Sequence, residues 1–229
     1  MEAILAALAP QLQLSRPGPL VPVLPALQDL LPERGLRPGA VVSVTGGGTA
    51  LLLALAAAAT ASGTWTAAVG FEGLGVLAAA ELGVDVSRLV VVETPRERLA
   101  DVALALADGF GLLLLRCAPP PGPVAERLAT VARRSGCAVV VAGQWPGARV
   151  RLRVAARRWV GVGQGRGRLR ARQLVVVAGG RGAAARERQV GLWLPDAQGA
   201  VRVADPQAPV SGEVGRVSAA AVRGPLVVV

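Results

Sequence analysis

Apolar strands alternate with glycine-bounded helices along much of this chain, and this pattern limits the folds open to it. An apolar run at residues 40–45 leads through the glycine triplet at residues 46–48 into an Ala- and Leu-rich helical stretch at residues 49–61. A second apolar run follows directly at residues 64–71. Strand, glycine turn, helix and strand in this order predict a βαβ unit, whose two strands are parallel.

The same alternation continues to residue 142. We expect helices at residues 72–82, 95–108 and 124–135. Buried strands are expected at residues 89–92 and 111–117, and another strand at residues 138–142. Thr94, Pro95 and Glu97 supply the hydroxyl, the N1 proline and the N3 carboxylate of a capped helix start. Nearly continuous apolar strands are typical of a parallel sheet that is covered on both faces. We therefore predict an α/β fold, a three-layer domain with a mainly parallel sheet.

Composition shifts mark the ends of this domain. Residues 1–38 are rich in Leu and Pro, and we interpret them as an N-terminal arm with a helical turn near residues 26–31. Apolar side chains in such an arm need cover from the domain's own surface or from another chain. The candidate docking residues are Leu5, Leu8, Leu12 and Leu14. The α/β domain then spans residues 39–205, and the Gly-, Pro-, Ser- and Val-rich residues 206–229 form a tail that we expect to be flexible.

The chain contains no Lys, His, Tyr or Asn. The lack of lysine excludes a Schiff-base amine and the phosphate-binding lysine of a P-loop, and the lack of histidine excludes an imidazole base and a His-ligated metal. Two cysteines cannot build a zinc site alone, and in a cytosolic protein they are most simply buried thiols. A GC-rich genome explains much of this composition. We expect no metal, no cofactor and no catalytic residue, and so no enzyme.

The glycine turn has the position of a phosphate-binding loop but lacks its chemistry. Such a loop follows the pattern GxxxxGK[ST], whereas Gly46, Gly47, Gly48 and Thr49 form a shorter segment without lysine. A magnesium site would also need an Asp at the end of an apolar strand, but Arg116 ends the leucine run here. These departures predict that hydrolysis has been lost. A glycine triplet before a helix can still bind an anion through its amides, or it simply makes the strand-to-helix turn.

Positive charge is concentrated in the second half of the chain. The net charge is +10; residues 1–115 carry 6 Arg and 10 acidic residues, whereas residues 116–229 carry 19 Arg and 5. This excess favours an anionic partner such as DNA or an acidic protein, although arginine also occurs on ordinary solvated faces. The candidate contacts are Arg149, Arg151, Arg153, Arg157, Arg158, Arg166, Arg168, Arg170 and Arg172.

The segment that carries these arginines has two interpretations. Arg149, Arg151 and Arg153 alternate with apolar residues as in a strand, yet residues 152–158 also fit a helix. Residues 159–162 and 169–178 have the composition of later strands.

The order of elements resembles the core of RecA-type recombinases. The resemblance covers residues 35–178 and is most specific at Leu82-Gly83-Val84-Asp85, which Leu89 follows; Gln144 at the end of a strand also fits. It implies a RecA-like fold whose catalytic motifs have degenerated. Phe71-Glu72-Gly73 lies where the catalytic Glu is expected. Both DNA-contacting loops of RecA are shortened or altered here.

Two degenerate RecA-like families fit such a chain. It resembles most the actinobacterial ImuA-type accessory proteins of the DNA-damage mutasome, which work with an inactive Y-family polymerase homologue and an error-prone polymerase α subunit. That resemblance implies a non-catalytic protein that docks these subunits, or RecA, in translesion synthesis, with self-association also open. The alternatives are a SulA-type inhibitor of cell division and an Arg-rich, DNA-binding pseudo-ATPase.

The sequence predicts neither export nor a membrane span. The start, Met1-Glu2-Ala3-Ile4-Leu5, lacks the basic region of a secretory signal. Residues 38–71 are uncharged, but the glycine triplet leaves only residues 49–62 as a glycine-free helical stretch, which is too short to cross a bilayer. We therefore expect a cytoplasmic protein.

Overall fold

The computed structural model describes residues 19–163 and 166–204, which are built around a mixed β-sheet. Its strands lie in the order β3-β2-β4-β5-β1-β6-β7-β8-β9. The first part of the sheet is parallel and consists of β1 (Val41–Thr45), β2 (Thr66–Val69), β3 (Leu89–Val92), β4 (Leu112–Arg116) and β5 (Ala138–Ala142). The strand β6 (Val150–Gly163) is parallel to β1, and the rest is antiparallel: β7 (Arg166–Gly180), β8 (Arg188–Trp193) and β9 (Arg202–Ala204).

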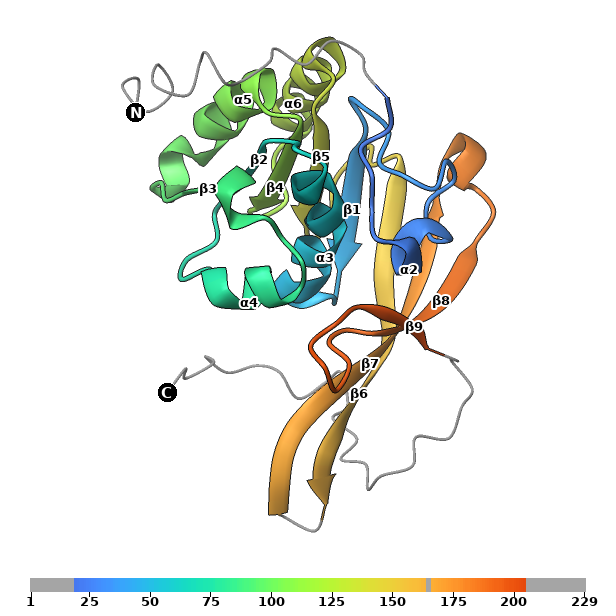
Figure 1. Ribbon diagram of the computed structural model, residues 1–229. Helices are drawn as coiled ribbons and strands as arrows, with labels where there is room; N and C mark the ends of the chain where they lie inside the picture. Colours follow the sequence, from blue (N-terminus) through green and yellow to red (C-terminus); the bar gives the residue numbers. More distant parts are fainter. Residues whose placement is uncertain (1–18, 164–165, 205–229) are drawn as a thin grey trace.

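Helices cover both faces of the parallel strands (Figure 1). On one face, α3 (Gly48–Ala61), α4 (Val76–Glu81) and the short α2 (Pro25–Gln28) contribute buried side chains to one core. On the other face, α5 (Leu99–Gly109) and α6 (Gly122–Ser135) form a second core with the sheet. The predicted three-layer α/β fold with a mainly parallel sheet is confirmed.

The leucine run of β4 shows how the sequence builds these two cores. Successive side chains of a strand point to opposite faces, so Leu112 and Leu114 lie in the core with α3, whereas Leu113 and Leu115 lie in the core with α5 and α6. All four are buried. The strand β3 differs, because it lies at the edge of the sheet and its side chains are only half-buried. The expectation of a buried strand there was wrong.

The described part of the expected N-terminal arm is packed into the domain. Val21 and Leu36 pair through two backbone hydrogen bonds of 2.9 Å, and the segment between them buries Leu27, Leu30 and Leu31 in the core with α3. The packed domain therefore begins well before residue 39, because the domain's own surface covers these apolar side chains. The candidate docking residues Leu5, Leu8, Leu12 and Leu14 lie outside the described residues, as does the tail at residues 206–229.

The helix expected from residue 95 begins later and without the expected cap. Pro95 has an extended backbone conformation, a single 3-10 turn follows at Arg96–Arg98, and α5 starts at Leu99. Neither start carries a side-chain cap, since Pro95 stands at the cap position of the 3-10 turn and Arg98 at that of α5. The preceding helix is also shorter than expected, since α4 covers only Val76–Glu81.

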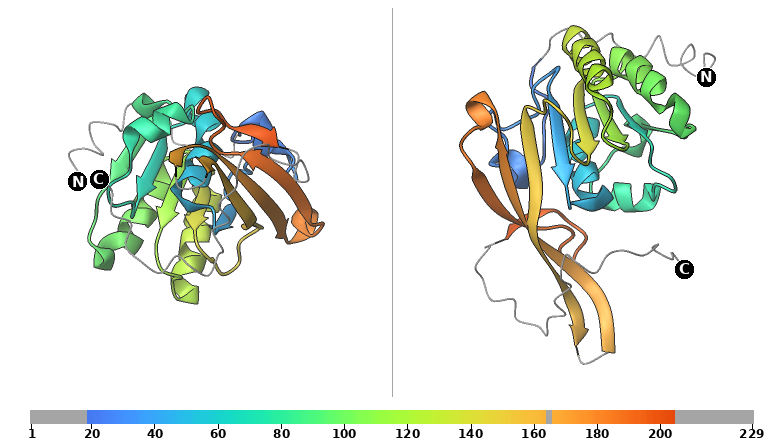
Figure 2. Two further views of the ribbon diagram at one scale, coloured as in Figure 1. Left: turned by 90° about the horizontal axis from the view of Figure 1, so that it is seen from below. Right: turned by 180° about the vertical axis from the view of Figure 1, so that it is seen from behind.

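The second half of the chain forms a long hairpin rather than a helix. Residues 152–158, which also fitted a helix, lie within β6, and β7 returns antiparallel to it. Figure 2 shows this hairpin projecting beyond the body of the domain. The strands β8 and β9 were not predicted, because their short segments lack a sustained apolar alternation. Within the described residues, no helix is both long enough and apolar enough to cross a membrane.

Candidate functional site

The glycine turn lies at the carboxyl edge of the parallel strands, where α/β proteins bind their ligands. The strand β1 ends at Thr45 and α3 begins at Gly48, so only Gly46 and Gly47 connect them. Gly46 and Gly48 both have positive φ, of 74° and 62°. A Cβ on Gly47 would lie 2.8 Å from Cδ2 of Leu51. The turn is packed tightly onto its own helix and is shorter than the loop of a P-loop protein.

Arg116, the last residue of β4, reaches back to this turn. Its Nη2 donates a hydrogen bond to Oγ1 of Thr49 over 2.5 Å, and its Cζ lies 4.7 Å from the centroid of the Phe71 ring. The guanidinium thus joins the end of one central strand to the first turn of α3 and stacks on Phe71, the second residue after β2. It holds a positive charge beside the turn, in the place where the RecA resemblance implies a magnesium-binding carboxylate.

Gly70 brings the ends of β2 and β4 together. It has a φ of 79°, and a Cβ there would lie only 2.0 Å from the carbonyl oxygen of Arg116. No L-residue with a side chain fits this close approach without moving one of the two strands. The position of Arg116 therefore depends on a glycine 46 residues earlier in the chain. The sequence alone did not predict this role of Gly70.

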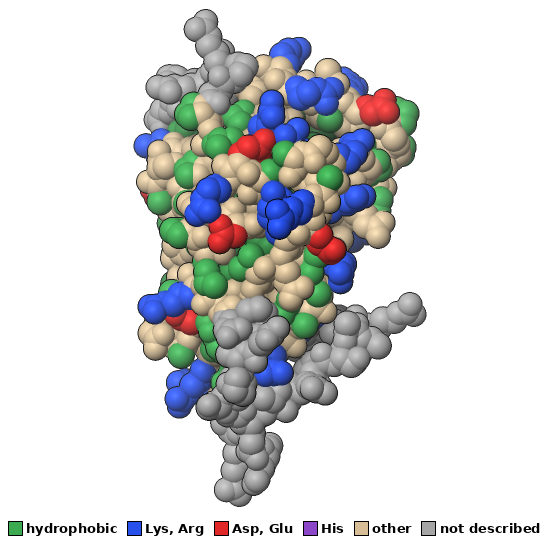
Figure 3. Space-filling model, turned by 90° about the vertical axis from the view of Figure 1, so that its right-hand side faces the viewer, with side chains coloured by type: hydrophobic (Ala, Val, Ile, Leu, Met, Phe, Trp, Pro, Cys, Tyr) green, Lys and Arg blue, Asp and Glu red, His purple; other side chains and the backbone are tan. Residues whose placement is uncertain are grey.

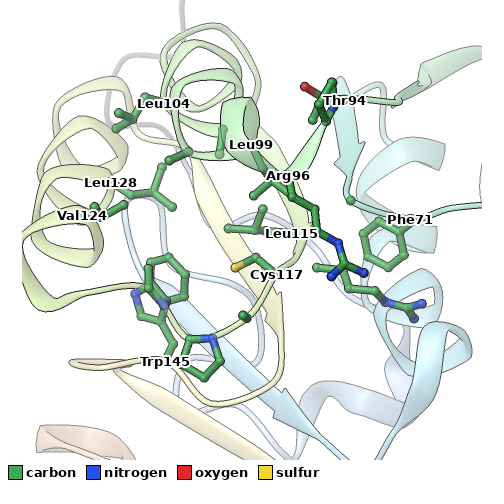
Figure 4. Close-up of a pocket in the computed structure, with 18 of the residues that line it drawn as sticks. Phe71, Thr94, Arg96, Leu99, Leu104, Leu115, Cys117, Val124, Leu128 and Trp145 are labelled. Atoms are coloured by element: carbon green, nitrogen blue, oxygen red, sulfur yellow. The ribbon is translucent and has the colours of Figure 1, made fainter.

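A cavity of about 1100 Å³ opens beside Arg116 at the same edge of the sheet. Apolar side chains from α5, α6, β4 and the loop after β5 line most of it, and Figure 4 shows how they surround it. The polyproline loop at residues 119–121 forms another part of its wall, and Glu72, Glu93, Arg96 and Arg116 contribute charge. Among the apolar residues that line the cavity, Figure 4 labels Leu99, Leu104, Leu115, Val124 and Leu128.

Two of the residues that line this cavity carry polar groups in apolar surroundings. Trp145 is only 6% exposed, and its indole Nε1 has no hydrogen-bond partner among the described residues. Burial raises the pKa of the Cys117 thiol, so this cysteine is neutral at pH 7. The sequence did not predict the cavity, because its lining comes from segments that only the strand order β2-β4-β5 brings together.

A smaller cavity of about 250 Å³ lies between α3 and α4. Thr49, Phe71 and Arg116 line it, together with Glu72, the residue that the RecA resemblance places at the catalytic Glu. Glu72 is exposed and lines both cavities. Within the part of the chain that the structure describes, no group of three or more Cys, Asp or Glu residues could hold a metal ion.

The structure divides the candidate contact arginines into two groups. Arg149 donates to Oε1 of Glu33 over 3.0 Å. Arg172 donates from Nε to the carbonyl oxygen of Leu194 over 2.8 Å and stacks on Trp159. Burial, together with the charge of Arg157, lowers the pKa of Arg172. These two arginines hold the fold together.

The remaining arginines of the hairpin face solvent. Arg158 is half-exposed, and the side chain of Arg166 is not among the described ones. The exposed arginines are Arg151, Arg153, Arg157, Arg168 and Arg170. Arginine side chains recur over the face of the molecule in Figure 3, with few acidic side chains between them.

Comparison with solved structures supports the RecA-like fold. The crystal structure of the RadB recombinase aligns with a TM-score of 0.56 over 79% of this chain and 97% of the RadB chain, at 15% sequence identity. At this identity, the likeness concerns the fold alone.

Sequence comparison adds a relative and a family. The uncharacterized protein Rv3395c of Mycobacterium tuberculosis (strain ATCC 25618 / H37Rv) is 40% identical over 146 residues, which are 62% of this chain and 66% of that protein. The model of the MT3502 N-terminal domain matches residues 29–147. This match begins at residue 29, within the segment that packs into the core, and ends just after Trp145. Because it spans more than half of the chain, the protein belongs to the MT3502 N-terminal domain family.

Proposed function

We propose that this protein is a non-catalytic, RecA-like accessory protein of DNA-damage-induced translesion synthesis, which acts in the cytoplasm by binding other proteins. The observation that carries the proposal is the position of Arg116, whose guanidinium is hydrogen-bonded to Thr49 at the degenerate nucleotide turn. A RecA-like domain that has lost nucleotide chemistry still has a folded surface. Binding of other proteins is the function that this surface supports best.

The charge of Arg116 is the first argument against nucleotide hydrolysis. An arginine side chain stays protonated at any physiological pH. Two unit positive charges 4 Å apart repel each other by about 4 kcal/mol at an effective dielectric constant of about 20, and a divalent cation is repelled more strongly. The hydroxyl of Thr49, which follows the turn, already accepts a hydrogen bond from Arg116. The chain also lacks any lysine to contact a phosphate.

The apolar cavity supplies the surface for a partner. Its volume of about 1100 Å³ and its lining of leucine, valine, proline and tryptophan suit apolar side chains of another protein. By the resemblance to ImuA-type proteins, the partners would be the inactive Y-family polymerase homologue, the error-prone polymerase α subunit, or RecA. The charged residues at the cavity would then contribute to orientation more than to affinity.

Affinity purification of the tagged full-length chain from DNA-damaged cells tests this proposal. We expect the mutasome polymerases or RecA to co-purify with the wild-type protein. Leu104→Glu, which places a charge at the half-buried wall of the cavity, should abolish this association. The matched control is Leu77→Glu, because Leu77 is 74% exposed on α4, which covers the opposite face of the sheet. Equal loss in both variants, or none in either, would contradict docking at the cavity.

Two further readouts separate the proposal from its alternatives. Release of inorganic phosphate from ATP or GTP by the purified protein, with or without DNA, would overturn the non-catalytic assignment. Filamentation of cells that overproduce the protein, without loss of damage-induced mutagenesis when the gene is deleted, would favour a SulA-type inhibitor instead.

A further inference from the structure

The hairpin of β6 and β7 leaves the sheet and continues as a two-stranded ribbon. The strand β6 pairs with β1 only as far as Arg153, and β7 pairs with β8 only from Gln173 onward. Between these points and the turn, β6 and β7 pair only with each other among the described residues. On β6 this distal ribbon runs from Arg157 to Gly163, about 20 Å at about 3.3 Å per residue, and Figures 1 and 2 show it projecting from the domain. Arg157 and Arg158 form its base, because they lie opposite Leu174 and Gln173, which also pair with β8.

Positive charge lies on both faces of the distal ribbon. Arg157 pairs with Leu174 and Arg158 pairs with Gln173, and neighbouring residues of a strand point to opposite faces. The returning strand adds the exposed Arg168 and Arg170. The sequence from residue 150 to residue 180 contains no Asp or Glu. In contrast with Arg149, which pairs with Glu33, none of these four guanidinium groups forms an ion pair within the described residues.

Several residues beside these arginines are small. Ala155 and Ala156 are exposed on β6, and glycine occurs at positions 161, 163, 165 and 167. A ribbon with small side chains between its arginines can lie close to a polymer backbone. A two-stranded β-ribbon also has dimensions that the major groove of B-DNA accepts.

We propose that this distal ribbon binds the phosphate backbone of duplex DNA through Arg157, Arg158, Arg168 and Arg170. This site is separate from the cavity proposed for protein partners. Binding of a phosphate backbone requires fixed positive charges and no apolar anchor, and the ribbon offers the former with little of the latter. Leu169, 51% exposed, is the one large apolar side chain on the described distal ribbon that is mainly exposed.

Two other anionic ligands fit the ribbon less well. Single-stranded DNA is held largely by stacking of bases on aromatic side chains, but Trp159 is the one aromatic residue of the hairpin, and Arg172 already covers its ring with Cζ 5.2 Å from the centroid. An acidic protein would form an interface around apolar or aromatic anchors, and Leu169 is the one mainly exposed large apolar side chain among the described residues of the distal ribbon. Duplex DNA remains the ligand that the observations favour.

Fluorescence anisotropy with the full-length chain tests the proposal. The probes are a labelled 24-base-pair duplex of mixed sequence and a 24-nucleotide single strand, titrated at several salt concentrations. The variant combines Arg157→Gln, Arg158→Gln, Arg168→Gln and Arg170→Gln. The control combines Arg98→Gln, Arg127→Gln, Arg133→Gln and Arg186→Gln, which removes the same net charge from exposed arginines elsewhere. Thermal unfolding checks that both variants are folded.

The proposal predicts a difference between these two variants. The ribbon variant should lose roughly tenfold or more in duplex affinity, and its slope of log K against log salt should become shallower by about 2 to 4. The duplex affinity of the control should stay within about threefold of wild type, because salt screens arginines that lie far from the bound DNA. Equal loss in both variants would overturn the assignment to the ribbon. Tighter binding of the single strand, or displacement of the duplex by polyglutamate at equal charge concentration, would overturn the assignment to duplex DNA.

Discussion

The guanidinium of Arg116 donates a hydrogen bond of 2.5 Å to the hydroxyl of Thr49, although 67 residues separate them in the chain. This bond connects the end of β4 to the first turn of α3. The RecA resemblance implies that these two positions flank a place for nucleotide phosphates and magnesium. This protein has an internal hydrogen bond and a positively charged side chain there.

Replacement of Arg116 by alanine should destabilise the domain. The substitution removes the hydrogen bond to Thr49 and the contact with Phe71, which together should lower the free energy of unfolding by about 1 to 2 kcal/mol. Urea unfolding measures this loss. Arg98→Ala, at an exposed arginine, should change it by less than about 0.5 kcal/mol. Equal stability of the two variants would contradict a structural role for Arg116.

Gly70→Ala should be among the most damaging small substitutions in the chain. The added Cβ would lie 2.0 Å from the carbonyl oxygen of Arg116, at a φ of 79°. We expect a loss of about 3 kcal/mol or more, because both strain and displacement of a strand contribute. Gly73→Ala is the control, since Gly73 has a φ of 63° but no atom within 4 Å of its added Cβ. That variant should lose about 1 kcal/mol. If the two variants lose similar free energies of unfolding, the close approach of β2 and β4 is not the reason that residue 70 must be glycine.

Leu30→Ala tests whether the segment before residue 39 belongs to the domain. Leu30 is fully buried in the core with α3, so its truncation should cost about 2 to 5 kcal/mol. Leu20, which is 42% exposed, provides the comparison, and Leu20→Ala should cost less than about 1 kcal/mol. Differential scanning calorimetry of both variants gives the result. A Tm of Leu30→Ala close to wild type would mean that this segment is an arm after all.

Cys137 should make the domain less stable in alkaline solution. Its side chain is fully buried, and burial raises the pKa of its thiol above the ordinary value. Above the pKa of the cysteine thiol in the unfolded chain, about 8.5, the unfolded state is stabilised by ionisation of this thiol, whereas the buried thiol stays neutral. The free energy of unfolding therefore falls as the pH rises beyond about 8.5. The expected slope is about 1.4 kcal/mol per pH unit. The chain has no Lys or Tyr to obscure it.

Unfolding of wild type and Cys137→Ala between pH 7.5 and pH 10 measures this effect. We expect the alkaline loss of stability to be much smaller in the variant, with a remaining part from Cys117, whose pKa is also raised by burial. Parallel pH profiles for the two proteins would show that Cys137 is not the titrating group.

The central part of the fold could be read from the sequence with errors of only a few residues. The strands β1, β3 and β5 lie within one residue of their predicted positions, because each is a short apolar run bounded by Gly, Pro or polar residues. The predicted start of α5 at residue 95 was wrong, since a 3-10 turn at Arg96–Arg98 comes first and the cap position of α5 falls on Arg98. The helical turn expected near residues 26–31 is present as α2, but Leu27 and Leu30 are buried in the core, so the domain begins before residue 39.

Some features of the candidate site could likewise be predicted from the sequence, and others could not. The absence of lysine and the arginine after the leucine run are visible in the sequence, and both predict that hydrolysis has been lost. The pairing of Arg149 with Glu33 and the stacking of Arg172 on Trp159 are not visible there, although they separate structural arginines from exposed ones. The cavity could not be predicted either, because its wall comes from several segments that are distant along the chain.

By itself, the sequence determined the layered α/β architecture, the lack of any lysine and the arginine after the leucine run, because strand and helix periodicity and residue inventory are local properties. Only the tertiary structure decided that Arg116 contacts Thr49, that Gly70 must lack a side chain, and that an apolar cavity opens beside them. These features depend on the strand order, which places β4 between β2 and β5. Local periodicity does not encode that order, since it follows from how the whole chain buries its apolar surface.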